Sequence, residues 1–307
     1  TLHLQQLRAY YRDIEVLEPA SALTIDFQRA LKYVENSLDD LRRKYLNRRV
    51  RKPFFDNAVN GVRDYEGSVQ SVDFSIPCGC FLFNIEYDSD SDGEDTEHWK
   101  LETYVVEDAE NHDWEDIAMD DRYLYISDSG NNFGNRKNLK IIITDPAVGF
   151  EKVGVINFSY ALQDDFNKRK IHPYDAEALM AVNDHLVLFS KNRAALTTEL
   201  YFLPKQPGDY QLSAIKSFDA QALITGGDYK QALQLAALVG YRPDGTQYLF
   251  ILPDFDLNVL EQLKMQRIEL PLEGKQIEAI KIIDAHTFWI TSEDEGIGHP
   301  MLYKVKY

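Results

Sequence analysis

The first 52 residues repeat apolar side chains at intervals of three and four, which is the spacing of one face of an α-helix. Pro19 interrupts this pattern, and Ser21 can cap a second helix. The apolar positions are Leu4, Leu7, Tyr11, Ile14 and Leu17, then Phe27, Leu31, Val34, Leu38, Leu41 and Tyr45. The pattern predicts a helical hairpin over residues 1–52 that packs on the rest of the chain. A dimer interface through the same face is the alternative.

After Pro53 the pattern changes to short apolar runs separated by clusters of Gly, Asp and Asn. Such runs, rich in Val, Ile, Phe and Tyr with turns about every ten residues, are typical of an all-β sandwich, barrel or propeller. Residues 53–307 are therefore expected to form one β domain. The predicted strands are residues 79–87, 101–106, 123–127, 139–144, 153–160, 185–190, 199–203, 233–241, 247–252, 287–291 and 301–305.

An internal repeat favours the propeller among these folds. An acidic residue, a short apolar strand, a polar turn and a second apolar strand recur at 113–128, 175–190, 225–239 and 276–291, with a fifth copy near residue 66. The acids are Glu66, Glu115, Glu177, Asp228 and Glu278, at spacings of 49, 62, 51 and 50 residues. A period near fifty matches one four-stranded blade. We expect a mainly β protein, a β-propeller of five or six four-stranded blades with an N-terminal α-helical hairpin.

The repeated acids are candidate metal ligands, because the innermost strands of a propeller line its axis and would bring them together. Several carboxylates in a shielded site repel one another unless a cation binds or some are protonated. Calcium suits a set of hard oxygen ligands. The acids could instead brace neighbouring blades by accepting backbone N–H groups. The sequence leaves both interpretations open.

Loops that follow the repeated strands carry candidate ligand-binding residues. Residues 128–136 combine turn formers with hydrogen-bonding side chains, and we expect Asp128, Asn131, Asn132 and Arg136 to contact a ligand. Salt bridges between blades are the simpler alternative for the charged members.

Four basic or titratable side chains are candidate catalytic residues. Lys191 and Arg193 could hold an anionic group beside the channel. His112 and His172 each precede a repeat and could act as general bases at the channel mouth. Ordinary turn positions would also explain both histidines.

A separate acidic segment resembles half of an EF-hand loop. Asp88, Asp90 and Asp92 stand at positions one, three and five, and Gly93 stands at six. Position twelve is Trp99, which cannot supply a carboxylate, so a helix-flanked EF-hand is excluded. A calcium-binding hairpin loop and a solvated acidic loop are both left open.

Composition excludes several classes of protein. The chain has 307 residues, 33 Lys and Arg against 50 Asp and Glu, and a net charge of −17, which disfavours nucleic-acid binding. No apolar run is long enough to span a membrane. Cys78 and Cys80 are too closely spaced for a zinc site, and free thiols or a labile disulfide are both open. Because Thr1 is no natural start, we expect a secreted protein whose leader has been removed.

Other catalytic templates are missing from the sequence. It contains no Gly-x-Ser-x-Gly nucleophile turn, no P-loop and no Gly-x-Gly-x-x-Gly segment. No nucleotide or flavin cofactor is therefore implied.

Residues 113–136, 174–193, 224–241 and 276–294 resemble a family of secreted β-propellers described as phytase-like or esterase-like. The matching motifs are Trp-Glu-Asp-Ile-Ala at 114–118, Asp-Ser-Gly-Asn-Asn at 128–132, Asp-Ala-Glu-Ala-Leu at 175–179 and Ser-Lys-Asn-Arg at 190–193. This resemblance implies the propeller fold, and a calcium-dependent phosphoesterase whose channel acids hold the metal. The helical segment 1–52 departs from the family.

The opening residues 1–11 and the chain length are similar to those of the secreted luciferases of syllid fireworms. That resemblance implies O2-dependent oxidation of a small aromatic luciferin with light emission and no bound redox cofactor. We expect a small molecule as partner and a monomeric protein. We expect the luciferase function, with the calcium-dependent phosphoesterase and a non-catalytic ligand-binding propeller as the alternatives.

Overall fold

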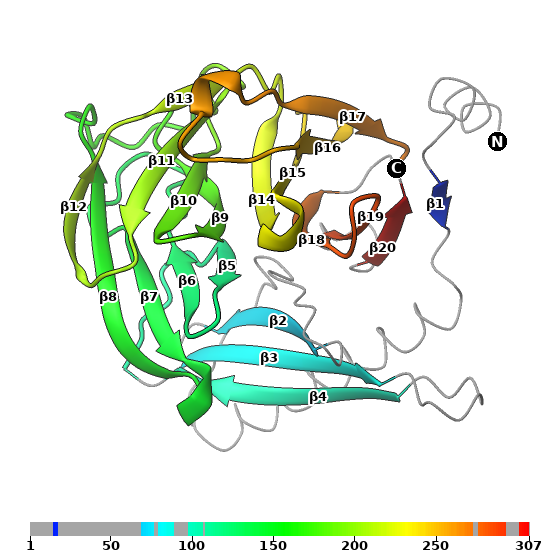
Figure 1. Ribbon diagram of the computed structural model, residues 1–307. Helices are drawn as coiled ribbons and strands as arrows, with labels where there is room; N and C mark the ends of the chain where they lie inside the picture. Colours follow the sequence, from blue (N-terminus) through cyan, green and yellow to red (C-terminus); the bar gives the residue numbers. More distant parts are fainter. Residues whose placement is uncertain are drawn as a thin grey trace.

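The computed structural model describes residues 15–17, 69–76, 79–88, 98–106, 108–272, 276–292 and 301–306. In this part of the chain there is no α-helix, and its sheets follow one another around a common centre (Figure 1). Three short 3-10 turns interrupt the strands: η1 (Pro146–Val148), η2 (Gln231–Leu233) and η3 (Leu260–Gln262).

Four sheets have the form of propeller blades. The first contains β5 (Asp116–Met119), β6 (Leu124–Asp128), β7 (Lys140–Asp145) and β8 (Glu151–Tyr160), with β12 (Gly208–Leu212) parallel to β8. The second contains β9 (Ala176–Val182), β10 (His185–Ser190), β11 (Thr198–Pro204) and β13 (Lys216–Phe218). The third contains β14 (Leu223–Lys230), β15 (Leu235–Tyr241), β16 (Gln247–Leu252) and β17 (Gln266–Leu270). The fourth contains β18 (Ile277–Ile282), β19 (Thr287–Ser292), β20 (Met301–Lys306) and β1 (Glu15–Leu17).

Apolar side chains on both faces of each sheet hold the blades together. Tyr160 and Tyr201 belong to the cluster between the first two sheets, and Phe189 and Phe250 to the next one. Phe288 belongs to the cluster between the third and fourth sheets. Strands buried on both faces read as continuous apolar runs, which is why the sequence located them well. The predicted β-propeller and all eleven predicted strands are confirmed.

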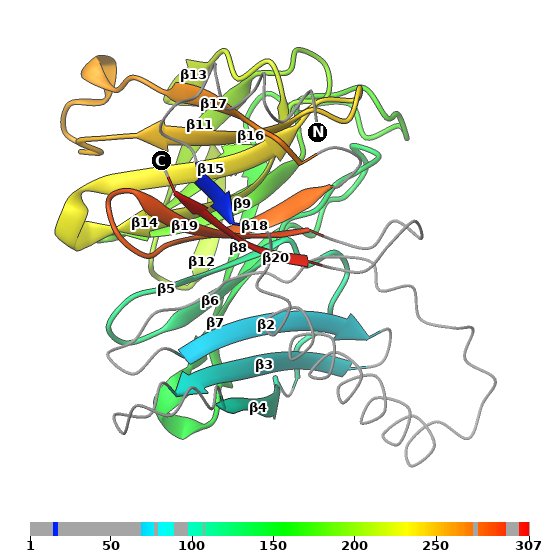
Figure 2. The ribbon, with the colours of Figure 1, turned by 90° about the vertical axis from the view of Figure 1, so that its right-hand side faces the viewer.

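A fifth, three-stranded sheet lies on the lower side of the molecule (Figures 1 and 2). It contains β2 (Val69–Ile76), β3 (Gly79–Asp88) and β4 (His98–Val105). The count of five or six four-stranded blades is not confirmed, because four sheets have that form in the described residues. Strands flank the acidic loop, with Asp88 opposite His98, so the exclusion of an EF-hand is confirmed.

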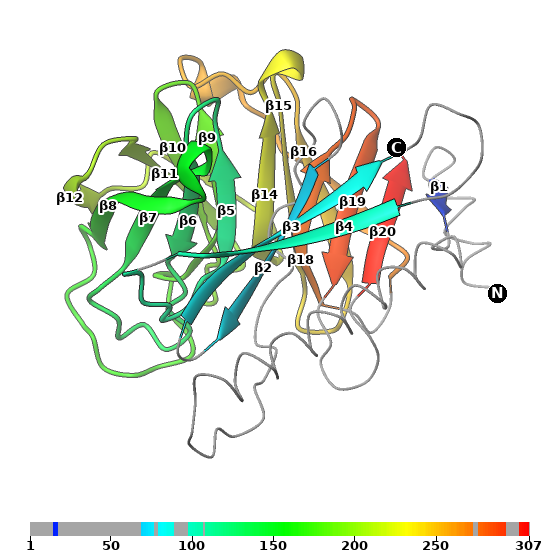
Figure 3. The ribbon, with the colours of Figure 1, turned by 90° about the horizontal axis from the view of Figure 1, so that it is seen from below.

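The N-terminal strand β1 corrects part of the predicted helical hairpin. Residues 15–17 pair with β20, with Glu15 opposite Lys306 and Leu17 opposite Lys304. The edge of β20 offers unpaired backbone groups, and satisfying them outweighs the helical spacing at these positions. The rest of residues 1–52 lies outside the described residues. Seen from below, β18–β20 lie on one side, β5–β8 on the other and β14–β16 between them (Figure 3).

Candidate functional site

Two of the inner strands, β9 and β18, begin with a bulge at an acidic residue. In β9, Ala176 pairs with Ser190 and Ala178 with Phe189, which leaves Glu177 unpaired between them. In β18 the same irregularity falls on Glu278. A β-bulge redirects a side chain at the end of a strand. Glu177 and Glu278 therefore occupy the same position in their two blades.

Six charged residues meet at this end of the inner strands and form what we call the hub cluster. They are Asp113, Glu115, Asp175, Glu177, Lys191 and Arg193. Glu278 lies close enough to influence both Glu177 and Lys191. The predicted convergence of Glu115, Glu177 and Glu278 agrees with this geometry.

Lys191 and Glu177 form a buried ion pair in the hub cluster. Their side chains are 4% and 3% exposed, and the Lys191 ammonium donates to Glu177 Oε2. Lys191 Nζ also lies 5.2 Å from the centre of the Tyr241 ring, at cation–π distance. Arg193 Nη2 lies 3.0 Å from Asp175 Oδ2 and 3.4 Å from Glu177 Oε1. Two cations therefore offset part of the negative charge.

The cluster reaches solvent through Asn132 and Arg193. Asn132 is exposed, donates to Asp113 Oδ2 over 3.2 Å, and accepts from Arg193 Nη2 over 2.5 Å. A methyl group on Gly130 would overlap the carboxylates of both Asp113 and Glu115, so the loop needs glycine at this close approach. Asn132 and Arg193 thus form a polar rim between solvent and the buried Glu177–Lys191 pair.

Burial dominates the acid–base properties of the hub cluster. It raises the pKa of Glu177 to about 8, although Lys191 opposes the rise. It raises the pKa of Asp113 to about 6, and the charge of Asp175 adds to the effect. Burial and then the charge of Glu177 raise the pKa of Glu115 well above its usual range. The pKa values of Asp113 and Glu177 lie close to neutral pH, which suits general acid–base chemistry.

The positive partner is held in its charged form. Burial alone would lower the pKa of Lys191, but the carboxylates of Glu177 and Glu278 outweigh burial and raise it. An ammonium fixed in this way can stabilise an anion that forms beside it.

Asp116 braces the inner strands directly behind the hub cluster. Its carboxylate accepts the backbone N–H groups of Leu179 at 2.8 Å, Gly227 at 3.3 Å and Ile117 at 2.8 Å. One side chain thus ties β5 to β9 and β14. Asp116 is not one of the repeated acids for which the sequence left bracing open, but it has that role.

Asp228 lies apart from the hub cluster. Its carboxylate accepts from Ile282 N at 2.8 Å and from Lys281 Nζ at 3.1 Å, and so joins β14 to β18. The bulge of β14 falls on Thr225, three residues earlier. The third copy of the repeat therefore has Thr225 at the position where the other copies have glutamate. Asp228 is not the equivalent of those glutamates, and its prediction as a member of the same site is wrong.

Three of the predicted ligand-binding residues shape the loop after β6. Asp128 is fully buried and lies 2.8 Å from Arg136 Nη2. Asn131 donates its backbone N–H to Asp175 Oδ1 over 2.7 Å and accepts from Arg136 N. These contacts fix the loop as a wall of the hub cluster. Asn132 is the member of the predicted set that reaches the rim.

The two predicted catalytic histidines lie outside the cluster. His112 Nδ1 is 3.4 Å from Asp128 Oδ2, and the side chain is 38% exposed. His172 is buried, and its Nδ1 accepts from Tyr174 N over 3.1 Å. Burial lowers the pKa of His172, which keeps the ring neutral at pH 7.

The remaining predicted metal ligands give no site in the described part of the chain. Glu66, Asp90 and Asp92 lie outside the described residues, and Asp88 is the last residue of β3. Among the residues that the structure does describe, no three His, Cys, Asp or Glu side chains could hold a metal ion.

Sequence reasoning missed four residues of this region. Asp113 and Asp175 each stand two positions before a hub glutamate, so a repeated Asp-x-Glu pattern could have identified them. Asp116 and Tyr241 carry no such signal, because their roles depend on strands from other blades.

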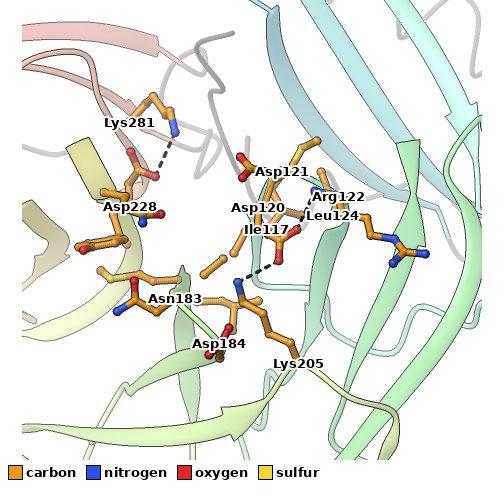
Figure 4. Close-up of a pocket in the computed structure, with 18 of the residues that line it drawn as sticks. Ile117, Asp120, Asp121, Arg122, Leu124, Asn183, Asp184, Lys205, Asp228 and Lys281 are labelled. Carbon is orange, nitrogen blue, oxygen red and sulfur yellow. Dashed lines mark hydrogen bonds and ion pairs between the residues drawn. The ribbon is translucent and has the colours of Figure 1, made fainter. Parts of the chain in front are cut away.

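The opposite end of the inner strands opens into a pocket of about 670 Å³ (Figure 4). Two ion pairs cross its walls, Lys205 Nζ to Asp120 Oδ2 at 2.9 Å and Lys281 to Asp228. Burial opposes the change, but hydrogen bonds from Lys205 and the adjacent turn lower the pKa of Asp120 to about 2. The carboxylates of Asp120 and Asp228 are therefore already paired with lysines of the protein.

Comparison with known proteins identifies no family. No protein-family profile and no curated protein match the chain. A Bacteroides uniformis protein described as a 6-phosphogluconolactonase is 12% identical, with 83% of this chain and 74% of that chain covered and a TM-score of 0.40. A chain of the mitotic checkpoint complex is 11% identical, with 86% and 97% covered and a TM-score of 0.41. A Thermus thermophilus protein described as a glucose dehydrogenase-type oxidoreductase is 10% identical, with 81% and 86% covered and a TM-score of 0.38. Similarity at this level carries no functional argument.

In the described segments, no helix has the length and apolar character needed to cross a bilayer.

Proposed function

We propose that this protein is a secreted enzyme of the luciferase type, which oxidises a small aromatic luciferin with O2 and emits light without a bound redox cofactor. The observation that carries the proposal is the buried Glu177–Lys191 pair beneath a solvent-exposed rim. An aromatic substrate must lose a proton to become electron-rich enough to react with O2 unaided. A buried base next to a fixed ammonium is suited to that step.

Each hub residue has a distinct part in this proposal. Glu177, with a pKa of about 8, takes the proton from the substrate. Lys191 stabilises the substrate anion, and Arg193 with Asn132 binds its polar end at the rim. Burial of the pair keeps water from the reacting atoms, and water would quench an excited product. The resemblance of residues 1–11 to fireworm luciferases supplies the substrate class.

Calcium-dependent phosphoester hydrolysis is the second candidate, favoured by the gathering of carboxylates beside Arg193. The described residues fit a calcium ion poorly. Lys191 already donates to Glu177 Oε2, and this contact would have to break before Glu177 could bind a metal. We therefore place this function behind the oxidation.

The test mixes the purified full-length chain with fireworm luciferin in air and records light. We expect emission that Glu177→Gln reduces by about 10²–10⁴-fold, the usual contribution of a general base. Asp184→Asn, an exposed carboxylate in the β9–β10 turn, is the matched control and should leave emission unchanged. Circular dichroism establishes that each variant is folded.

Other outcomes would redirect the assignment. Darkness from folded protein eliminates the luciferase. Phosphate release that chelators abolish would establish the phosphoesterase. Thermal stabilisation by a ligand without turnover would establish a binding propeller.

A further inference from the structure

Two loops at the hub end of the propeller expose large apolar side chains. The loop between β6 and β7 carries Phe133, which is 46% exposed. The loop between β8 and β9 carries Leu162 and Ile171, which are 82% and 71% exposed. Single exposed apolar residues are ordinary, but a group of them in one place marks an interaction surface.

Hydrogen bonds join the two loops into one surface, which we call the loop lip. Arg169 N donates to Phe133 O over 2.9 Å, and Gln163 Nε2 donates to Gly134 O over 2.8 Å. The hydroxyl of Tyr174 donates to Leu162 O over 2.7 Å, which ties the start of the second loop to its end. The two segments that carry the three apolar side chains are therefore bonded to each other.

The loop lip is positively charged on an acidic protein. The two loops, residues 129–139 and 161–175, contain five Lys and Arg against three Asp, whereas the whole chain has a net charge of −17. Lys137, Lys168 and Lys170 are exposed. Lys137 Nζ lies 4.6 Å from the centre of the Phe166 ring, and Lys168 Nζ lies 5.9 Å from that of Phe133. Ammonium groups thus stand beside the apolar side chains.

We propose that the loop lip docks on an anionic phospholipid surface. Interfacial binding combines apolar side chains that enter the headgroup layer with lysines that meet anionic lipids, and the loop lip supplies both. An acidic polysaccharide would use the lysines but would leave Leu162 and Ile171 without a role. Asn132 is next to Phe133 in the chain and lies on the hub rim, so docking brings the hub cluster to the membrane. The proposal does not depend on which reaction the hub performs.

The first test measures co-sedimentation of the full chain with vesicles of phosphatidylcholine, with and without phosphatidylserine. We expect binding at least about tenfold tighter to the anionic vesicles, and a fall in binding as salt rises from about 0.1 to about 0.5 M. The triple variant F133S/L162S/I171S should lose at least about tenfold. Leu233→Ser, 40% exposed in η2, is the matched control and should bind as the wild type does.

The second test reverses the charge of the loop lip. Lys137→Glu with Lys168→Glu should abolish the preference for phosphatidylserine, whereas Lys264→Glu, an exposed lysine beyond η3, should keep it. If the triple apolar variant unfolds, Leu162→Ser alone replaces it, with an expected loss of about threefold. Equal binding to both vesicle types, binding unaffected by the apolar variants, or binding to heparin but not to vesicles would each overturn the proposal.

Discussion

Asp116 offers the most direct test of how the propeller is held together. Its buried carboxylate accepts N–H groups from Leu179 and Gly227, which belong to two other blades, and from Ile117 beside it. Asp116→Ala would leave the two N–H groups from other blades buried without an acceptor. Each such group costs about 1–3 kcal/mol. Because the Gly227 bond is long at 3.3 Å, we expect a total loss of about 2–5 kcal/mol.

The assay is equilibrium unfolding in urea, followed by circular dichroism. Asp184→Ala removes an exposed carboxylate from a neighbouring inner turn and should change the unfolding free energy by less than about 0.5 kcal/mol. Asp116→Asn removes the charge but keeps one oxygen acceptor, so it should fall between the wild type and Asp116→Ala. The reasoning fails if Asp116→Ala matches the Asp184 control, or if Asp116→Asn is more stable than the wild type. Either result would mean that the cost of burying the charge outweighs the hydrogen bonds.

Three further predictions concern the two ends of the inner strands. Gly130→Ala should push apart the Glu115 and Asp113 carboxylates and reduce hub activity at least about tenfold while the fold persists, as an activity assay with circular dichroism would show. The wild-type rate should rise with pH through about 8 as Glu177 loses its proton, and a Glu177→Gln pH–rate profile that kept this rise would exclude Glu177 as the base. Asp120 has a pKa lowered to about 2 from 3.8, so it stabilises the fold above about pH 4. Urea unfolding should therefore show that the wild type is more stable than Asp120→Asn at pH 6, and that this difference disappears as the pH falls toward 2. A difference in unfolding free energy that stayed constant with pH would contradict the prediction.

The strands of the propeller could be predicted because a strand that is buried on both faces consists of a continuous run of apolar residues. The segments 185–190 and 247–252 were located to the residue as β10 and β16. The short strand β13 and the strand β12 were not predicted. β12 pairs with β8 of the neighbouring blade, and nothing in the sequence around β12 indicates that it would join that blade.

The hub was predictable only in part, for a physical reason. Glu115, Glu177 and Glu278 were expected to converge because they repeat at a constant place in the blade. The repeat pattern groups Asp228 with them because it predicts an acid in every copy, whereas backbone geometry puts Thr225 at the bulge. Bulge positions depend on strand register, and one sequence does not reveal register.

The pairing of β1 with β20 also governs the order in which the protein can fold during its synthesis. Glu15 lies opposite Lys306, which follows it by 291 positions. At about 5–20 residues per second, a ribosome needs about 15–60 s to make the partner of β1. For that time the earliest strand of the last blade has no neighbour to bind. A newly made chain can therefore pair β1 with β20 only after translation has reached the final strand.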